Sequence, residues 1–203
     1  MVRRGDLGRG EALVTQPLVL ASTSPQRRAI LEQLAIPFDP VAPRYVEHDP
    51  PDADPVALVR EHALGKARSV HTAGRTTLGV DTTVHLGQRV YAKPRDEDDA
   101  RTMLRELAGR THAVVSGVCL ITSSGEVVEH AETLVTFRAL DDTAIDRYAA
   151  SGEWEARAGG YAIQGLGGRL VERVDGDYLN VVGLPGALLV DLLERHAPAL
   201  LAL

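Results

Sequence analysis

The sequence has few of the residues that would join the chain covalently or place it in a membrane. Its 203 residues include one cysteine, Cys119, which excludes an intrachain disulfide and a zinc site built from cysteines. Cys119 lies in the apolar run VVSGVCLI, so we expect a buried core residue rather than a catalytic thiol. The apolar run VVGLPGALLV contains a proline, ends at Asp191 and is too short to span a bilayer. The N-terminal arginines precede no apolar run of signal-peptide length. We therefore expect a cytoplasmic protein with no membrane partner.

Aromatic residues and excess positive charge are also scarce. Aromatics make up 4% of the chain, so aliphatic side chains must form most of the core. The net charge is −6 and no basic stripe is apparent, which disfavours a nucleic-acid partner. Hydrophobic residues at 44% and charged residues at 25% are typical of globular proteins. We expect residues 1–16 to form a disordered N-terminal extension and residues 17–203 to form one domain, since this length suits one large domain or two intimate lobes.

Strand-like and helix-like segments alternate along the chain, which predicts an α/β fold. The predicted strands are 18–21, 76–86 with a hairpin turn at Gly87-Gln88 into RVYA, 112–123, 126–140 and 169–174. The predicted helices are 25–35, 55–71, 97–108, 144–151 and 185–197. We expect a loop at 38–54, a loop or bent strand in the glycine-rich segment AGGYAIQGLGG, and a turn at DGDY.

The first predicted helix carries a possible phosphate site. Ser24 is a suitable N-cap before Pro25, and Arg27 and Arg28 lie in the first turn. Backbone N–H groups at a helix N-terminus bind phosphate, and arginines add charged, bidentate contacts. The same spacing also fits an ordinary capped helix with two solvated arginines, and spacing alone favours that interpretation.

Asp81 lies in the strand segment GVDTT, where alternation places Val80 and Asp81 on opposite faces. An acid among apolar residues costs free energy unless it is paired or binds a metal. Its carboxylate offers the oxygen ligands that Mg²⁺ prefers, and it can accept a proton from an attacking water. An exposed acid at the rim of the sheet is an equally good interpretation of the pattern alone.

Other candidate residues are weaker when each is taken alone. Lys66 and Lys93 can approach a phosphate chain as point charges, and Glu47 offers a second oxygen ligand, but each also fits a solvated surface position. Gln164, within the glycine-rich segment, has the donor and acceptor needed to read a base edge. Its glycines do not match the dinucleotide-binding or P-loop spacing. His112 is expected to be a packed or strand-edge residue rather than a ligand.

Several blocks taken together resemble the Maf family. They are LASTSPQRRAILEQLAIPF, GVDTTV, AKPRDEDDARTMLRELAGRTHAVVSGV, GEWEARAGGYAIQGLGG and YLNVVGLP, in order over about residues 17–195. This series is far more specific than any single motif. The resemblance implies a mixed, curved sheet with flanking helices, forming two lobes around a deep cleft and related to the inosine triphosphatase (Ham1-like) fold. It implies a cytoplasmic, dimeric nucleoside triphosphate pyrophosphatase that uses Mg²⁺ or Mn²⁺ and yields the nucleoside monophosphate and pyrophosphate.

The resemblance also implies roles for individual residues. Asp81 matches the family's general base, and Glu47 matches the acidic residue near the metal. Phosphate-binding roles fall to Ser24, Arg27, Lys66 and Lys93, with Arg28 as an added basic residue of the same helix turn. Ala92 stands where the family usually has glycine before Lys93.

The family divides by substrate into a dTTP and UTP branch and a 7-methyl-GTP branch. Thr82 and Gln164 match the pyrimidine branch. The 7-methyl-GTP branch has Gln and Glu at these two positions. A neutral glutamine suits a neutral uracil edge, whereas a carboxylate suits the positively charged methylguanine. Gln26 departs from both branches, which often have Arg or Trp there, and the adjacent Arg27-Arg28 pair offers a replacement charge.

We therefore expect hydrolysis of dTTP and UTP, or of modified pyrimidine nucleotides. One alternative is the same chemistry on 7-methyl-GTP or other nucleotides. Another is a nucleotide-binding regulator of septum formation, which would not need a general base. An α/β structural protein would leave the ordered series of blocks unexplained.

Overall fold

The computed structural model describes residues 16–50 and 53–202. The expectation that residues 1–16 are disordered falls almost entirely outside the described residues. Within them, no helix combines the length and the apolar character needed to cross a membrane.

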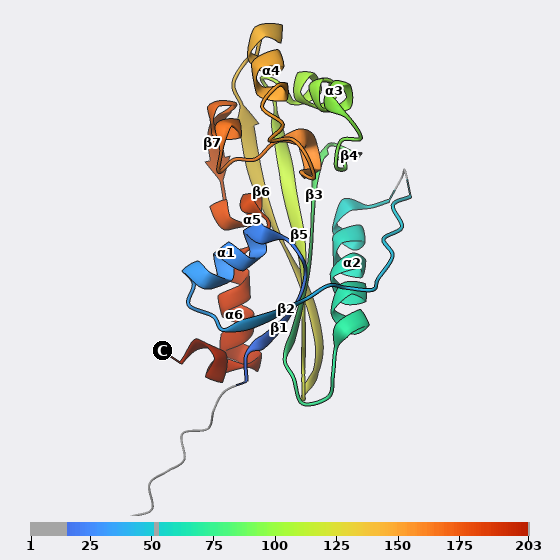
Figure 1. Cartoon of the computed structure of the whole chain (residues 1–203), viewed down its shortest axis with the longest axis vertical. Coiled ribbons are helices and arrows are strands. Elements are labelled where there is room, and N and C mark those ends of the chain that lie inside the picture. The colour runs from blue at the N-terminus through green and yellow to red at the C-terminus, as the bar shows by residue number, and fades with distance from the viewer. Residues whose placement is uncertain (1–15, 51–52, 203) are drawn as a thin grey trace, which may run out of the picture.

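A mixed seven-stranded sheet forms the centre of the molecule, in the order β2-β1-β3-β5-β6-β7, with β4 pairing with β3 (Figure 1). β1 is parallel to β2 and β3, and the other pairs are antiparallel. The strands are β1 (Leu18–Ala21), β2 (Phe38–Val41), β3 (Thr77–Leu86), β4 (Arg89–Tyr91), β5 (Thr111–Thr122), β6 (Gly125–Phe137) and β7 (Val171–Asp175). The long strands β3, β5 and β6 run almost the whole length of the molecule.

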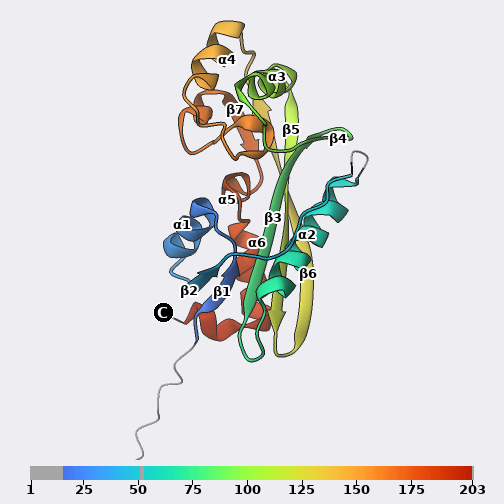
Figure 2. The same cartoon turned by 45° about the vertical axis from the view of Figure 1, so that its right-hand side comes forward.

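Helices cover both faces of this sheet (Figures 1 and 2). α2 lies on one face against β3 and β5, while α1, α5 and α6 lie on the other, and α3 and α4 lie at one end. The helices are α1 (Pro25–Gln33), α2 (Pro55–Val70), α3 (Glu97–Leu107), α4 (Asp142–Ala149), α5 (Tyr178–Val182) and α6 (Gly186–His196), with 3-10 turns η1 (Ala158–Gly160), η2 (Leu166–Arg169) and η3 (Pro198–Leu201).

Two glycines allow α2 to approach the sheet closely. A Cβ on Gly79 would lie 2.1 Å from the carbonyl oxygen of Ala63, and one on Gly117 would lie 2.1 Å from that of Val59. Because side chains alternate along a strand, Gly79, Asp81 and Thr83 share the face that α2 covers. The sheet therefore presents Asp81 to α2.

The opposite face of the same strands carries two separate hydrophobic clusters. One contains Val80 and packs under α1 and α6. The other contains Val84 and packs under α3 and α4. Thr82 lies between these two valines on β3, so the two lobes meet at its position. This arrangement confirms the predicted mixed sheet with flanking helices and two lobes.

Two local predictions were wrong. Residues 38–41, expected to be loop, form β2, because FDPV pairs with β1 at the edge of the sheet, where the missing N–H of Pro40 is tolerated. Residues 178–182 form the short helix α5, whose N-cap Asp177 accepts a hydrogen bond from the N–H of Leu179. The expected turn at DGDY therefore ends in a helix start.

Candidate active site

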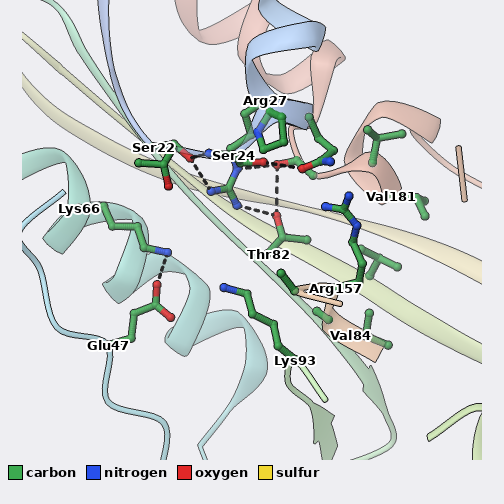
Figure 3. A pocket seen from close by; sticks show the side chains of 18 of the residues that line it. Ser22, Ser24, Arg27, Glu47, Lys66, Thr82, Val84, Lys93, Arg157 and Val181 are labelled. Carbon is green, nitrogen blue, oxygen red and sulfur yellow. Dashed lines mark hydrogen bonds and ion pairs between the residues drawn. The ribbon is translucent and has the colours of Figure 1, made fainter. Parts of the chain in front are cut away.

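A cavity of about 360 Å³ opens where the two lobes meet (Figure 3). Its walls come from the loop after β1, the start of α1, the middle of β3, the segment before α3, the glycine-rich segment and the end of α5. Four basic side chains line it, Arg27, Lys66, Lys93 and Arg157. Among the residues that the structure describes, Glu47 is the one acidic residue in its wall. Such a wall suits a polyanion.

The strand register creates this opening. β1 pairs with β3 only as far as Ala21 opposite Gly79, and β4 pairs with β3 from Val84 onward. The edge of β3 is therefore unpaired on that side over residues 80–83. Asp81 and Thr82 lie in this gap, so groups from both faces of the sheet are brought to the cavity.

Asp81 forms a short contact with Lys66, which also binds Glu47. The Lys66 Nζ donates to Asp81 Oδ1 at 2.5 Å and lies 2.6 Å from Glu47 Oε1. Lys66 is buried, and the Asp81 side chain is 13% exposed. Lys66 and Glu47 line the cavity, and Asp81 contacts Lys66 without being among the lining residues. A single ammonium group therefore bridges two carboxylates at one end of the cavity and offsets only one of their two negative charges.

The loop after β2 places Glu47. The Tyr45 ring packs on Gly65 of α2, where an added Cβ would lie 2.3 Å from the ring. The N–H of Arg44 donates to the hydroxyl of Ser69 at 3.1 Å. These contacts hold the loop on α2, one helical turn from Lys66, and so bring the Glu47 carboxylate to the lysine.

His62 is a member of this cluster that sequence reasoning missed. It is buried on α2, with Nδ1 3.5 Å from Asp81 Oδ2 and Nε2 3.5 Å from Asp49 Oδ1. The hydrogen bond with Asp81 raises the pKa of His62, against the opposing effect of burial. The signal was present, because His62 and Lys66 are four residues apart and therefore share one helix face.

The surroundings of Asp81 keep it ionised. Burial by itself raises the pKa of its carboxyl group, but the hydrogen bond from His62 and the charge and hydrogen bond of Lys66 outweigh that effect. The pKa of Asp81 therefore lies well below its usual range. The interpretation of Asp81 as a rim-exposed acid was wrong, since the residue is largely buried and paired.

Arg27 connects three elements beside the cavity. Its Nε donates to the carbonyl oxygen of Gly183 at 2.9 Å, and its terminal nitrogens donate to Ser22 Oγ at 3.2 Å and Thr82 Oγ1 at 3.3 Å. Burial lowers the pKa of Arg27, although the charges of Asp81 and Glu47 oppose this. Arg27 is therefore not a solvated surface arginine, and its guanidinium is fixed.

Ser24 does not cap α1 with its side chain. It occupies the N-cap position, but its hydroxyl donates to Gln26 Oε1 at 2.9 Å. Thr82 Oγ1 lies 2.8 Å from Ser116 Oγ. Ser24, Gln26 and Thr82 all line the cavity.

The remaining basic residues differ in whether they line the main cavity. Lys93 is exposed and points into the cavity from the segment before α3 (Figure 3). Arg28 lines a different hollow beside Glu32, Ile36 and Phe38, so the structure does not place it with the other candidates. Arg157, which sequence reasoning did not select, lines the main cavity. The sequence signal for Arg157 is limited to its position in the block GEWEARAGGYAIQGLGG.

Gln164 lies in a second, adjoining hollow of about 310 Å³. Gln26, Arg157, Tyr161 and Val181 line both this hollow and the main cavity. The two hollows therefore adjoin each other, with Gln164 beside one and the Lys66 cluster beside the other.

The carboxylates near Lys66 also have the geometry of a cation site. One ligand atom each from Glu47, His62 and Asp81 lie within 4.8 Å of one another. Carboxylate oxygens suit Mg²⁺ and Mn²⁺, and imidazole suits transition metals. The donor set therefore fits a divalent cation, in exchange for the Lys66 ammonium group.

Comparison with known proteins gives consistent matches over nearly the whole chain. The family model described as Maf-like protein matches residues 17–196. A dTTP/UTP pyrophosphatase of Nitratidesulfovibrio vulgaris is 43% identical over 191 residues, 92% of this chain and 91% of that protein. Proteins of the same description from Deinococcus radiodurans and Pyrococcus furiosus are 44% and 42% identical, over 87% of this chain and 91% and 94% of theirs.

Among solved structures, the Ham1 protein of Staphylococcus aureus is a distant match. It is 10% identical, with a TM-score of 0.43, over 60% of this chain and 72% of that one.

Proposed function

The chain belongs to the Maf family, and from this premise we propose that it hydrolyses dTTP and UTP to the nucleoside monophosphate and pyrophosphate. The observation that carries the proposal is the Asp81–Lys66–Glu47 cluster at one end of a cavity lined by basic side chains. Curated relatives described as dTTP/UTP pyrophosphatases, at about 43% identity, support the substrate class.

In this proposal the phosphate chain lies along the basic wall of the cavity. Lys66 and Lys93 neutralise its charge, while Arg27 and Ser24 hold the phosphates from the start of α1. Phosphoryl transfer is catalysed mainly by positioning and by charge neutralisation, and the cavity offers both.

Glu47, Asp81 and His62 would hold a divalent cation, with Mg²⁺ or Mn²⁺ as the proposed ions. Such an ion supplies neutralisation of phosphate charge and lowers the pKa of water bound to it. The fit rests on the donor set and on its compactness.

Asp81 is proposed to orient the attacking water toward the α-phosphorus. Its low pKa keeps it anionic at neutral pH, so it can accept a hydrogen bond from the water. A carboxylate of low pKa is a weak proton acceptor, which favours orientation over complete proton abstraction before attack. His62 fixes the second carboxylate oxygen and so limits rotation of the side chain.

The nucleobase is proposed to enter the hollow that contains Gln164. A neutral amide has the donor and acceptor to match the edge of uracil or thymine. Gln26 lies between this hollow and the phosphate cavity, and Thr82 lies at the junction of the lobes. The preference for dTTP and UTP over 7-methyl-GTP rests on these positions.

We also propose that the protein acts as a cytoplasmic homodimer on small nucleotides, without nucleic acid or membrane. The family resemblance, the net charge of −6 and a buried single thiol support this. Sedimentation would distinguish a dimer from the 21.8 kDa monomer.

The deciding experiment is pyrophosphate release from dTTP, UTP, CTP, GTP and 7-methyl-GTP, with Mg²⁺, Mn²⁺ or chelator. Wild type would be compared with Asp81→Asn, and Asp175→Asn, an exposed acid on β7, is the matched control. We expect metal-dependent release from dTTP and UTP that only Asp81→Asn abolishes, with nucleotide binding retained.

Other outcomes would redirect the proposal. Release mainly from 7-methyl-GTP would keep the reaction and refute the specificity. Nucleotide binding without release from any substrate would favour the regulator of septum formation instead.

A further inference from the structure

The four basic residues of the cavity differ in what they already bind. Arg27 donates to Gly183, Ser22 and Thr82, and Lys66 lies between Glu47 and Asp81. The side chains of Lys93 and Arg157 form no hydrogen bond or ion pair with any residue that the structure describes. Lys93 and Arg157 are therefore the basic side chains that can bind an anionic ligand without giving up an existing contact.

Hydrogen bonds and a close packing contact fix the backbone around Arg157. Its N–H donates to the carbonyl of Trp154 at 3.1 Å, and its own carbonyl accepts from Gly160 at 3.0 Å. The neighbouring Gly159 donates to Ala92 at 3.3 Å and packs on Val84 so tightly that a Cβ would lie 3.0 Å away. Gly159 also has φ of 71°, which other residues rarely adopt. The backbone position of Arg157 is thus set in advance of any ligand.

The Arg157 side chain has an unsatisfied donor. Its Nε is shielded from solvent and has no partner among the described residues. A buried N–H without an acceptor costs free energy, and such groups call for a specific explanation. An anionic ligand beside the guanidinium would supply the missing acceptor.

Arg157 lies at the junction of the two hollows. It lines the cavity that ends at Lys66 and Glu47, and it also lines the hollow that contains Gln164. Figure 3 shows Lys66 and Glu47 on one side of the cavity and Arg157 on the other. In a nucleoside triphosphate, the α-phosphate is the group between the nucleoside and the terminal phosphates.

We propose that Arg157 is a further substrate-binding residue, which contacts the α-phosphate. This inference rests on the proposed function, because that function sets the base at Gln164 and the terminal phosphates at Lys66. A planar guanidinium can bind two phosphate oxygens at once. Arg157 would then stay with the monophosphate product, whereas Lys66 would face the departing pyrophosphate.

The test compares the binding of three probes by calorimetry in buffer with Mg²⁺. UMP carries the α-phosphate, uridine lacks it, and pyrophosphate represents the leaving group. We expect Arg157→Gln to weaken UMP binding at least tenfold while changing uridine and pyrophosphate binding less than twofold. Arg157→Lys, which keeps the charge, should recover part of the loss. Arg147→Gln, an exposed arginine on α4, is the matched control and should leave all three unchanged.

The probes separate this assignment from a merely structural role, which would weaken all three in parallel. Unchanged UMP binding in Arg157→Gln would overturn the proposal, as would equal losses for uridine or pyrophosphate. A wild type that binds UMP but releases no pyrophosphate from any nucleotide would refute the proposed function alone. A wild type that releases pyrophosphate from UTP but binds no UMP would overturn the Arg157 assignment alone.

Discussion

At the scale of single residues, the two adjacent arginines of α1 show how little separates a site residue from a surface residue. Arg27 is fixed by three hydrogen-bond acceptors beside the cavity, and Arg28 lies in another hollow. Successive helix residues are about 100° apart around the axis, so neighbours in sequence face different surroundings.

We expect Arg27→Lys to weaken UTP binding at least about tenfold, because a lysine cannot keep three directed contacts and each charged hydrogen bond is worth about 1.5–3 kcal/mol. Arg28→Lys is the matched control and should bind UTP like wild type. Titration of UTP into each variant, with a non-hydrolysable analogue if turnover interferes, gives the measurement. Equal losses in both variants would mean that Arg28 also binds substrate.

Cys119 was expected to be buried, and it is. Burial raises the pKa of its thiol to about 12. At pH 8 the thiolate fraction is then on the order of 10⁻⁴, and the thiolate is the reactive form. We expect no reaction with a disulfide reagent such as DTNB over an hour in native buffer, and one equivalent of reaction in guanidinium chloride. Fast labelling of the native protein would contradict this placement.

The residue types in the sequence predicted most of the candidate site, but they did not indicate His62 or Arg157. The order of blocks pointed to Asp81, Lys66, Lys93, Glu47 and Gln164. Lys66, Lys93 and Glu47 line the main cavity, Gln164 lines the adjoining hollow, and Asp81 contacts Lys66. His62 and Arg157 were missed because their contacts are tertiary. His62 meets Asp81 across the α2–β3 interface, and Arg157 reaches the cavity through the unusual backbone of a glycine-rich turn.

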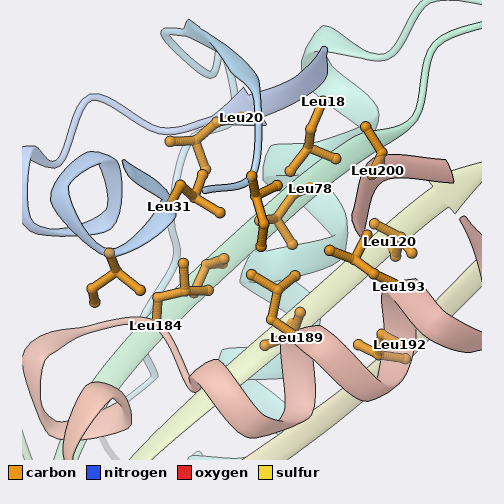
Figure 4. Close-up of a cluster of buried hydrophobic side chains, with 14 residues drawn as sticks. Leu18, Leu20, Leu31, Leu78, Leu120, Leu184, Leu189, Leu192, Leu193 and Leu200 are labelled. Atoms are coloured by element: carbon orange, nitrogen blue, oxygen red, sulfur yellow. The ribbon is translucent and has the colours of Figure 1, made fainter. Parts of the chain in front are cut away.

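At the scale of elements, periodicity and capping residues predicted the helices well. Asp96 and Asp141 accept hydrogen bonds from Asp99 and Ala144 at the starts of α3 and α4, as N-caps do. The buried face of α1 includes Leu31, which is fully buried in the cluster with Leu189 and Leu193 of α6 (Figure 4). The edge strand β2 and short α5 escaped prediction because each depends on a neighbour for its pairing.

The close approach of α2 to the sheet should be sensitive to one methyl group. In Gly117→Ala the new Cβ would lie 2.1 Å from the carbonyl of Val59, so α2 must move. Overpacking of this kind costs about 1–3 kcal/mol. Since α2 also carries His62 and Lys66, we expect a lower urea midpoint together with a loss of turnover.

Gly74→Ala provides the contrast for this prediction. Gly74 has φ of 82° but open space around it, so the cost is about 1 kcal/mol of backbone strain. Turnover should then remain at the wild-type level. If Gly117→Ala lost stability while keeping full activity, the position of α2 would not control the site.

At the scale of the whole molecule, His112 connects stability to pH. It is buried on β5, with Nε2 2.9 Å from the Tyr161 hydroxyl and an edge-to-face contact with Phe137. Burial, with a smaller effect from His85, lowers the pKa of His112 to about 4. In the unfolded chain a histidine has a pKa near 6.5. The unfolded state therefore binds an extra proton between these two values.

Because of that proton, the contribution of His112 to stability should be full above pH 6.5 and fall as the pH drops toward 4. The slope is about 1.4 kcal/mol per pH unit, or about 2 kcal/mol between pH 6.5 and 5. Between pH 7.5 and 5, we expect the free energy of unfolding measured in urea to fall by about 2 kcal/mol less in His112→Gln than in wild type. His130→Gln, an exposed histidine on β6, should behave like wild type. Identical pH dependence in all three proteins would exclude this role for His112.

The two hydrophobic clusters share β3, with Val80 in one and Val84 in the other. A single extended strand, rising about 3.3 Å per residue, therefore sets the interval between the lobes. If the base lies at Gln164 and the terminal phosphates at Lys66, β3 fixes the distance that a substrate must span to reach both. A nucleoside diphosphate, one phosphate shorter, would then fill only one end at a time.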